Sequence, residues 1–202
     1  MRLSDMLLFP REMYLRLSGK KWVLIPGVIF IGIADMMLLL IDKYFVIFKN
    51  KEQSIINRNI LLAALFIIAL GIVDAAFFSL PLFDIFKLFG KEENPPLQEN
   101  QLVKLLKIYI MAHFITVPVE LILYVASLNI SVINTGLIYL LVFLQILLPF
   151  WYSAAIARGI NAIYRFQPVF KALVFIAVFV WSYLLSYALS YMAENWLLPL
   201  FG

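Results

Sequence analysis

Long apolar stretches separated by short polar connections dominate the pattern along the chain. A bilayer core of about 30 Å needs about 20 helical residues to cross it, and five stretches are long enough. They lie at about 22–41, 60–80, 105–127, 132–157 and 170–193. Lys, Arg, Glu, Asn and Pro gather in the connections. The pattern predicts an all-α fold, a polytopic membrane bundle of five transmembrane helices with short interfacial helices, in a single membrane domain over residues 1–202.

The N-terminal segment, residues 1–21, has a pattern of its own. Apolar residues recur there at helical spacing on both sides of Pro10, with Arg and Glu between them. This spacing predicts a short helix in the membrane interface, broken at Pro10 and ending near Gly19. A disordered cytosolic tail is the alternative. Scattered charges and the lack of a small-residue cleavage site argue against a signal peptide.

The composition supports an integral membrane protein. Hydrophobic residues make up 64% of the chain and charged residues 14%, against about 45–50% and about 25% in soluble domains. Mean hydropathy is +0.97. The chain has no Cys and one His, which excludes disulfides, thiolate chemistry and a His-rich metal cluster. We expect no metal or cofactor, and the net charge of +4 is too small for nucleic-acid binding.

The Lys and Arg distribution predicts a cytoplasmic N-terminus and an outer C-terminus. With that orientation twelve basic residues are cytoplasmic and four are outside, all four in the connection between the first two stretches. The loop after the third stretch and the tail after the fifth carry none. The lipid bilayer is the expected partner, with anionic lipid at the basic side.

The first two stretches echo each other. Gly32-Ile33-Ala34-Asp35 and Gly71-Ile72-Val73-Asp74 are offset by 39 residues. The repeat indicates either a duplicated helix or chance similarity between two segments rich in Ile and Leu.

Four ionisable side chains lie inside the stretches, where a charge costs at least about 2.5–3.5 kcal/mol. They are Asp35, Asp74, His113 and Glu120. From a rise of about 1.5 Å per helical residue, Asp74 and His113 lie in the cytoplasmic half and Asp35 and Glu120 in the outer half. We therefore predict an Asp74–His113 pair and an Asp35–Glu120 pair.

Three roles are open for these groups. Each can be protonated or hydrogen-bonded and fix helix packing, or they can form a proton or cation path in a wet cavity. Catalysis is disfavoured, because the Gly-x-Gly-Asp signature of intramembrane aspartyl proteases is absent, as are His-Glu-x-x-His, Gly-x-Ser-x-Gly and a phosphate-binding loop. No catalytic or cofactor-binding residue is expected, and the protein is not predicted to be an enzyme.

The last stretch carries a regular stripe of small polar residues. Ser182, Ser186 and Ser190 are four residues apart. Small residues at this spacing allow close helix approach, so we predict that the stripe packs against another helix. That helix can belong to the same chain, to a second copy in a homo-oligomer, or to another membrane protein.

Two segments resemble bacterial Yip-family proteins. They are LLFPREMYLRLSGKKWVLIPGVIFIG at 7–32 and FWYSAAIARGINAIYRFQPVFKALVFIAVFVWSYLL at 150–185. The resemblance implies five spans, a cytoplasmic N-terminus in the bacterial cell membrane, and a non-enzymatic role in membrane organisation or partner recruitment. The Asp-Leu-Tyr-Gly-Pro motif of eukaryotic members is absent, so a link to Rab-dependent trafficking does not follow.

Two function classes therefore remain. The first is a membrane scaffold, adaptor or partner-recruiting subunit. The second is a small transporter or channel subunit that handles protons or cations through its buried acids. A water-accessible cavity lined by the four ionisable groups would favour the second.

Overall fold

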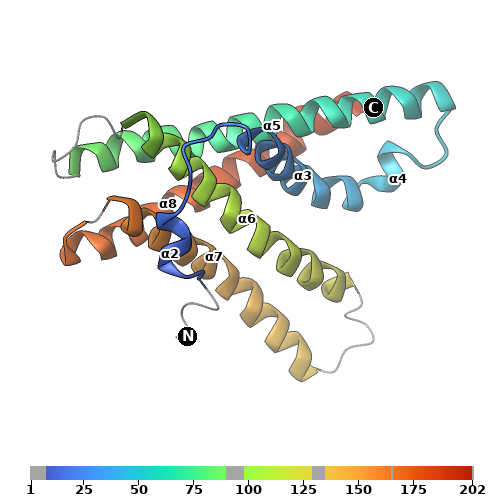
Figure 1. The fold of residues 1–202 in the computed structure, drawn as a ribbon. Coiled ribbons are helices and arrows are strands. Elements are labelled where there is room, and N and C mark those ends of the chain that lie inside the picture. The colour runs from blue at the N-terminus through green and yellow to red at the C-terminus, as the bar shows by residue number, and fades with distance from the viewer. Residues whose placement is uncertain (1–7, 90–97, 129–134, 165, 202) are drawn as a thin grey trace.

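The computed structural model describes residues 8–89, 98–128, 135–164 and 166–201, and these residues form an all-α bundle (Figure 1). Five helices are long and apolar enough to cross a membrane, which confirms the fold class expected from the sequence. They are α3 (Leu24–Asp42), α5 (Gln53–Phe89), α6 (Gln98–Leu128), α7 (Thr135–Tyr164) and α8 (Pro168–Met192).

Four shorter elements complete the described fold. Before and after α3 lie α2 (Arg11–Leu15) and α4 (Tyr44–Ile47). A π-helical turn, η3 (Ala193–Leu197), and a 3₁₀ turn, η4 (Leu198–Phe201), continue α8 to the end of the chain.

The helices extend beyond the apolar stretches. α5 has 37 residues, about 55 Å at about 1.5 Å per residue, which is longer than the hydrocarbon core is thick. Its helical hydrogen bonding continues into polar residues at both ends, because leaving the lipid does not require a helix to stop. α6 likewise begins inside the polar connection expected at 91–101, of which 91–97 lie outside the described residues.

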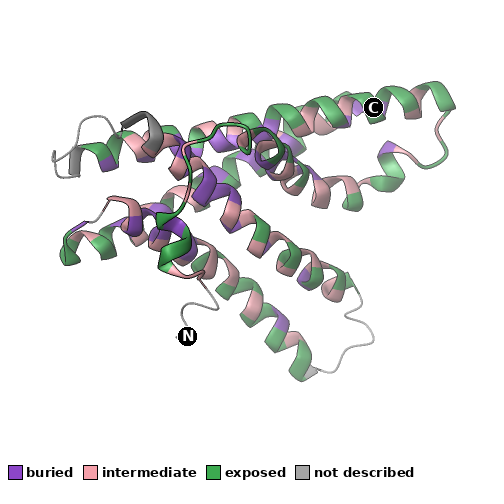
Figure 2. Cartoon of the chain, viewed as in Figure 1, coloured by how far each residue is buried: buried purple, intermediate pink, exposed green. Residues whose placement is uncertain are grey.

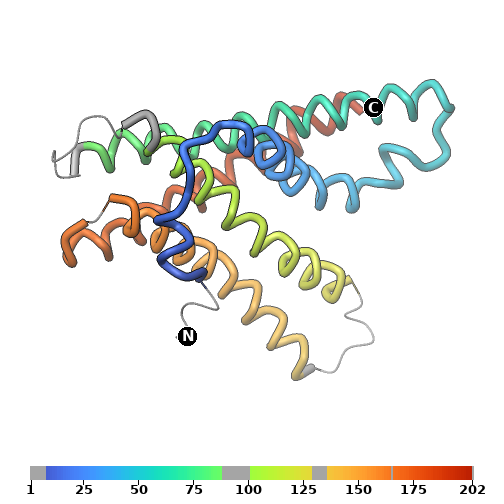
Figure 3. Tube along the Cα trace, in the orientation of Figure 1, coloured from blue at the N-terminus to red at the C-terminus, as the bar shows by residue number. Residues whose placement is uncertain are grey.

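The long helices form two arms that meet at one end and diverge at the other (Figures 1 and 3). In one arm, α3 packs extensively on α5, and α8 also lies against α5. In the other, α6 and α7 form an antiparallel hairpin that leans away at the right of the view. Contacts of α6 with α3 and α5, and of α7 with α8, join the arms.

Large apolar side chains cover the outer faces of the long helices. Leu61, Ile72, Phe143, Ile146 and Ile176 are each more than half exposed. Figure 2 shows exposed residues along these faces and buried ones where the arms meet. Such a surface is stable only against lipid. The chain is therefore an integral membrane protein.

The N-terminal segment docks onto the joined end of the bundle. The Tyr14 hydroxyl lies 2.9 Å from the Leu8 carbonyl oxygen and 3.1 Å from that of Ala155 in α7, and burial raises the pKa of Tyr14 to about 12. Gly159 of α7 leaves room for the Tyr14 ring, since a Cβ there would approach the ring to 2.9 Å. The helix ends at Leu15, earlier than the predicted end near Gly19, and packs on protein as well as facing the interface.

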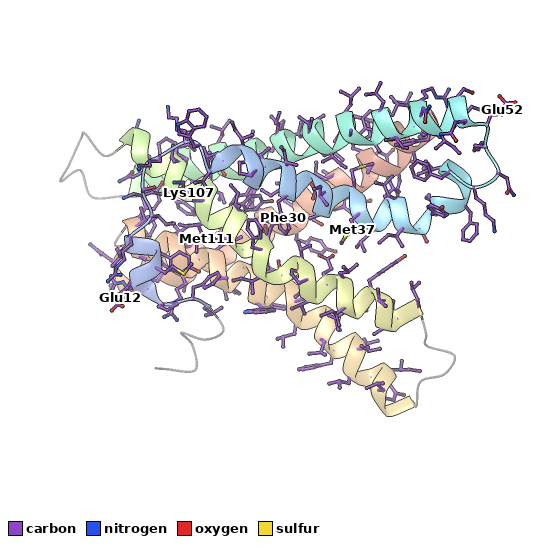
Figure 4. All side chains as sticks on the ribbon, turned by 45° about the vertical axis from the view of Figure 1, so that its right-hand side comes forward. Glu12, Phe30, Met37, Glu52, Lys107 and Met111 are labelled. Carbon is purple, nitrogen blue, oxygen red and sulfur yellow. The ribbon has the colours of Figure 1, made fainter. Side chains whose placement is uncertain are left out.

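A lysine completes this docking. Nζ of Lys107, which is buried in α6, donates to the Ser18 carbonyl at 2.7 Å and lies 3.2 Å from its hydroxyl. Figure 4 shows Lys107 at the end of the bundle that also carries Glu12 of α2. The Lys107 side chain of α6 thus holds the N-terminal segment against the joined end of the bundle.

Candidate functional site

α3 and α5 cross in direct backbone contact at two glycines. A Cβ placed on Gly32 would lie 1.8 Å from the Ile67 carbonyl oxygen, and one placed on Gly71 would lie 2.1 Å from that of Val28. The contact is nearly symmetrical, because each added Cβ would also come within 3.0 Å of the other glycine's nitrogen. Only glycine permits this approach.

The crossing accounts for the echoed Gly-Ile-x-Asp motifs. Asp35 and Asp74 each follow a crossing glycine by three residues, and the two helices run in opposite directions. At about 1.5 Å per residue, the aspartates lie about 4.5 Å to either side of the crossing along the helix axes. The two aspartates thus lie on opposite sides of the crossing, which is compatible with the separate halves of the bilayer expected from the sequence. Asp35, Asp74 and Glu120 nevertheless line one cavity.

A compact polar network surrounds Asp74. The Tyr109 hydroxyl lies 2.8 Å from both carboxyl oxygens of Asp74, and His113 Nε2 lies 3.9 Å from Oδ2. His113 Nδ1 is 3.0 Å from the Tyr109 carbonyl, which can only accept, so Nδ1 carries a hydrogen. The Tyr152 hydroxyl lies 3.3 Å from Nδ1 and 3.4 Å from Nε2, and because Nδ1 carries the hydrogen, the hydroxyl can donate to Nε2. The Asp74–His113 pair expected from the sequence is thus in close contact.

An acidic cavity of about 510 Å³ lies between the two arms. All four ionisable residues singled out in the sequence line it, together with two acids from the ends of α3 and α8. No Lys or Arg contributes to its lining within the described part of the chain. The lining carboxyl groups are those of Asp35, Asp42, Asp74, Glu120 and Glu194.

The cavity is elongated and has a deep end and a mouth. Its lining on α8 and the following turn η3 runs from Phe179 to Glu194, about 22 Å of helix. Asp74 is buried at the deep end, whereas Glu120 and Glu194 are exposed where the arms diverge. Asp42, also toward the mouth, is paired with Lys43 at 2.6 Å.

The serine stripe forms one wall of the cavity. Ser182, Ser186 and Ser190 all line it, with Ser182 half-buried and the other two exposed. The stripe therefore presents hydroxyls to the space between α8 and the α6–α7 hairpin. The close helix contact found here uses Gly32 and Gly71 instead.

Several cavity oxygens have no hydrogen-bond partner within the described residues. They are Oδ2 of Asp35, Oγ of Ser153 and Oγ of Ser182, from three different helices. Ser153 is only 1% exposed. Buried polar groups without partners cost about 1–3 kcal/mol each, so these oxygens indicate a cavity that holds water or a polar ligand.

Two pairs of stacked aromatic rings join neighbouring helices near the cavity, and Tyr109 of the first pair lines it. The Tyr109 ring stacks on Phe78 of α5 with centroids 3.8 Å apart, and Phe78 is fully buried. Phe30 and Phe114 form a second stack between α3 and α6, with centroids 4.0 Å apart, and Figure 4 places Phe30 between the arms.

Several residues of the site were not expected from the sequence. Tyr109 precedes His113 by four residues, which places both on one helix face, so this spacing could have found it. Asp42 follows Asp35 by seven residues, which places both on one face of α3, so this spacing could have found it as well. Tyr152 and Glu194 carry no such signal. Their helices come to the cavity through tertiary packing alone.

Comparisons with protein-family models, curated proteins and solved structures find no match to this chain. The resemblance to Yip-family proteins therefore stays a prediction. The geometry of the acidic cavity is the basis for the function proposed below.

Proposed function

We propose that this protein is a small non-enzymatic transporter or channel subunit whose acidic cavity is a cation path. The observation that carries the proposal is the convergence of five carboxyl groups on one cavity of about 510 Å³ without a lining Lys or Arg among the described residues. Ionisable residues inside membrane bundles are costly, and they are retained where they handle protons or ions.

The Asp74 network is suited to exchange a proton at the deep end. His113 holds one hydrogen on Nδ1 and faces Asp74 with Nε2, so a second proton taken up at Nε2 forms an ion pair with Asp74. Asp35 and Glu120 provide further carboxyls along the cavity toward its mouth. A cation that moves from the mouth toward Asp74 thus meets carboxyl oxygens along the whole length of the cavity.

The distribution of charge supports a direction for this path. Acids line the cavity, whereas Lys107 and the basic N-terminal segment lie at the joined end. With the N-terminus cytoplasmic, as the Lys and Arg count predicts, the mouth faces outward and receives the cation from that side.

Flux through proteoliposomes tests the proposal. Wild-type protein in vesicles with an inside-negative potassium diffusion potential is expected to take up protons, read by an entrapped pH dye, or radioactive rubidium, faster than empty vesicles. Glu120→Gln is expected to abolish this uptake and leave folding intact, because Glu120 is exposed and the amide keeps its shape. Asp84→Asn is the matched control, since Asp84 is an exposed acid outside the cavity lining.

Two outcomes would contradict the proposal: no uptake of either ion by the wild type, or unchanged uptake in Glu120→Gln. Either result would favour the scaffold or adaptor function. One observation independently fits that second candidate. The docked N-terminal segment presents Arg11, Arg16 and Lys20 from the joined end, where a partner protein or anionic lipid could bind them.

A further inference from the structure

We propose that the ligand of the acidic cavity is an organic ammonium ion with N–H donors, a protonated amine rather than a bare metal ion. This inference rests on the proposed cation-handling function and names the chemical class of its cation. The amine can be a free solute or the headgroup of a lipid, because the cavity lies between two arms that diverge inside the membrane.

The cavity has the aromatic walls that organic cations favour. Tyr109, His113 and Tyr152 form an edge-to-face cluster, with centroids 4.5 Å apart for Tyr109–His113 and 5.2 Å for His113–Tyr152. Phe179 lies on the α8 wall and stacks on Phe150 at 4.6 Å. Aromatic faces attract ammonium groups within about 6 Å of the ring centroid, most strongly where water is excluded.

The size of the cavity also fits a molecule rather than an ion. Its volume of about 510 Å³ is within the range of about 300–1,000 Å³ typical of small-molecule sites. A dehydrated metal ion needs several ligands at one point, and no three His, Asp or Glu side chains come together in that way in the described ranges. The carboxyls instead follow the length of the cavity.

The unpartnered oxygens supply acceptors for N–H groups. Asp35, Ser153 and Ser182 line the cavity, and Oδ2 of Asp35 and the two serine hydroxyl oxygens are buried without hydrogen bonds, whereas a primary ammonium has three donors. Asp74 differs, because its carboxyl group already accepts the one hydrogen of the Tyr109 hydroxyl, which lies 2.8 Å from both carboxyl oxygens. A ligand with N–H donors satisfies the oxygens that the fold leaves open, which a quaternary ammonium cannot do.

Hydrogen bonds of the neighbouring residues place these oxygens at similar depth. Tyr152, next to Ser153, reaches His113, which faces Asp74. Trp181, next to Ser182, donates to the Phe77 carbonyl at 3.0 Å, and Phe77 is three residues from Asp74. The Ser153 and Ser182 oxygens thus lie within one or two helical turns of the Asp74 network, and both serines line the same cavity.

Protection of a single cysteine tests the inference, because the natural chain has none. Ser186→Cys places a thiol on the exposed part of the cavity wall. In phosphatidylglycerol vesicles, its reaction with a trimethylammonium methanethiosulfonate is expected to be faster than with the sulfonate analogue. Butylammonium at twice its dissociation constant is expected to slow the reaction about threefold. Potassium at equal ionic strength, tetramethylammonium and neutral butanol are expected to slow it much less.

Two variants control this measurement. Tyr187→Cys places the thiol one residue away on an exposed position outside the cavity lining, where no protection is expected. Adding Ser153→Ala to Ser186→Cys removes one open acceptor and is expected to weaken protection by the amine about tenfold. Vesicles with phosphatidylethanolamine and no added amine identify the source: protection there indicates a lipid headgroup, and its absence a soluble amine.

The results separate this inference from the proposed function. If potassium or tetramethylammonium protects as well as butylammonium, the N–H ammonium ligand is wrong and the cation path stands. If no cation protects and the two charged reagents react equally fast, both proposals fail.

Discussion

The glycine crossing of α3 and α5 can be tested by adding a single methyl group. Gly32→Ala places a Cβ 1.8 Å from the Ile67 carbonyl oxygen, whereas ordinary contact begins at about 3.4 Å. The carbonyl oxygen belongs to the α5 backbone and the Cβ is bonded directly to the α3 backbone, so no side-chain rotation relieves the clash. The two helices must separate by up to about 1.6 Å at this point.

Such overpacking costs about 1–3 kcal/mol, and loss of close contact along the crossing adds to it. For a chain of 202 residues, about 1 kcal/mol corresponds to about 2–4 °C in the melting temperature. We expect Gly32→Ala to melt about 2–12 °C below the wild type. Separation also moves Asp35 away from Asp74, so cation uptake is expected to fall.

Thermal unfolding in detergent, followed by tryptophan fluorescence, measures the effect. Gly136→Ala is the matched control, because nothing lies within 4 Å of the added Cβ there. Its melting temperature is expected to stay within about 2 °C of the wild type, since such changes are usually within about 0.5 kcal/mol. A Gly32→Ala protein as stable as the wild type would refute the backbone contact and the placement of the two aspartates.

Three further predictions concern the ends of the bundle. Asn59 is fully buried and donates to the carbonyls of Ile47 at 2.8 Å and Phe201 at 3.2 Å. Asn59→Ala is therefore expected to lower the free energy of unfolding by about 1–3 kcal/mol. An unchanged free energy of unfolding in chemical denaturation would contradict these bonds. Tyr14→Phe is expected to cost about 0.5–1.5 kcal/mol by loss of the hydroxyl's bonds. Burial raises the pKa of Tyr14 to about 12 in the folded protein. The stabilisation by the Tyr14 hydroxyl is therefore complete below the unfolded pKa of about 10 and is lost as pH rises through about 12. A stability difference between wild type and Tyr14→Phe that disappears between about pH 6 and 9 would refute this prediction. Leu200→Cys, in a chain without other Cys, is expected to react with an impermeant thiol reagent in intact cells, and reaction only after permeabilisation would overturn the outer C-terminus.

The sequence by itself determined that the protein is an integral membrane protein and which ionisable residues are candidates for its site. A stretch such as 22–41 is apolar over the thickness of a bilayer, and the resulting preference for lipid is a local property that needs no partner. The cost of an ionisable group in such a stretch is equally local, which is why Asp35, Asp74, His113 and Glu120 could be selected without coordinates. Helix ends were less accurate, because the helical hydrogen bonds of α5 continue into water at either end.

Only the tertiary structure decided what these residues do together. Helical rise gave heights along each helix, but it contains no information on which faces meet. The contact between Gly32 and Gly71 sets the spacing of the two aspartates, and the divergence of the α6–α7 hairpin opens the cavity that Glu120 reaches. Tyr152 joins through a helix far along the chain. Such contacts depend on how whole helices pack, a property of pairs of surfaces that no single stretch of sequence encodes.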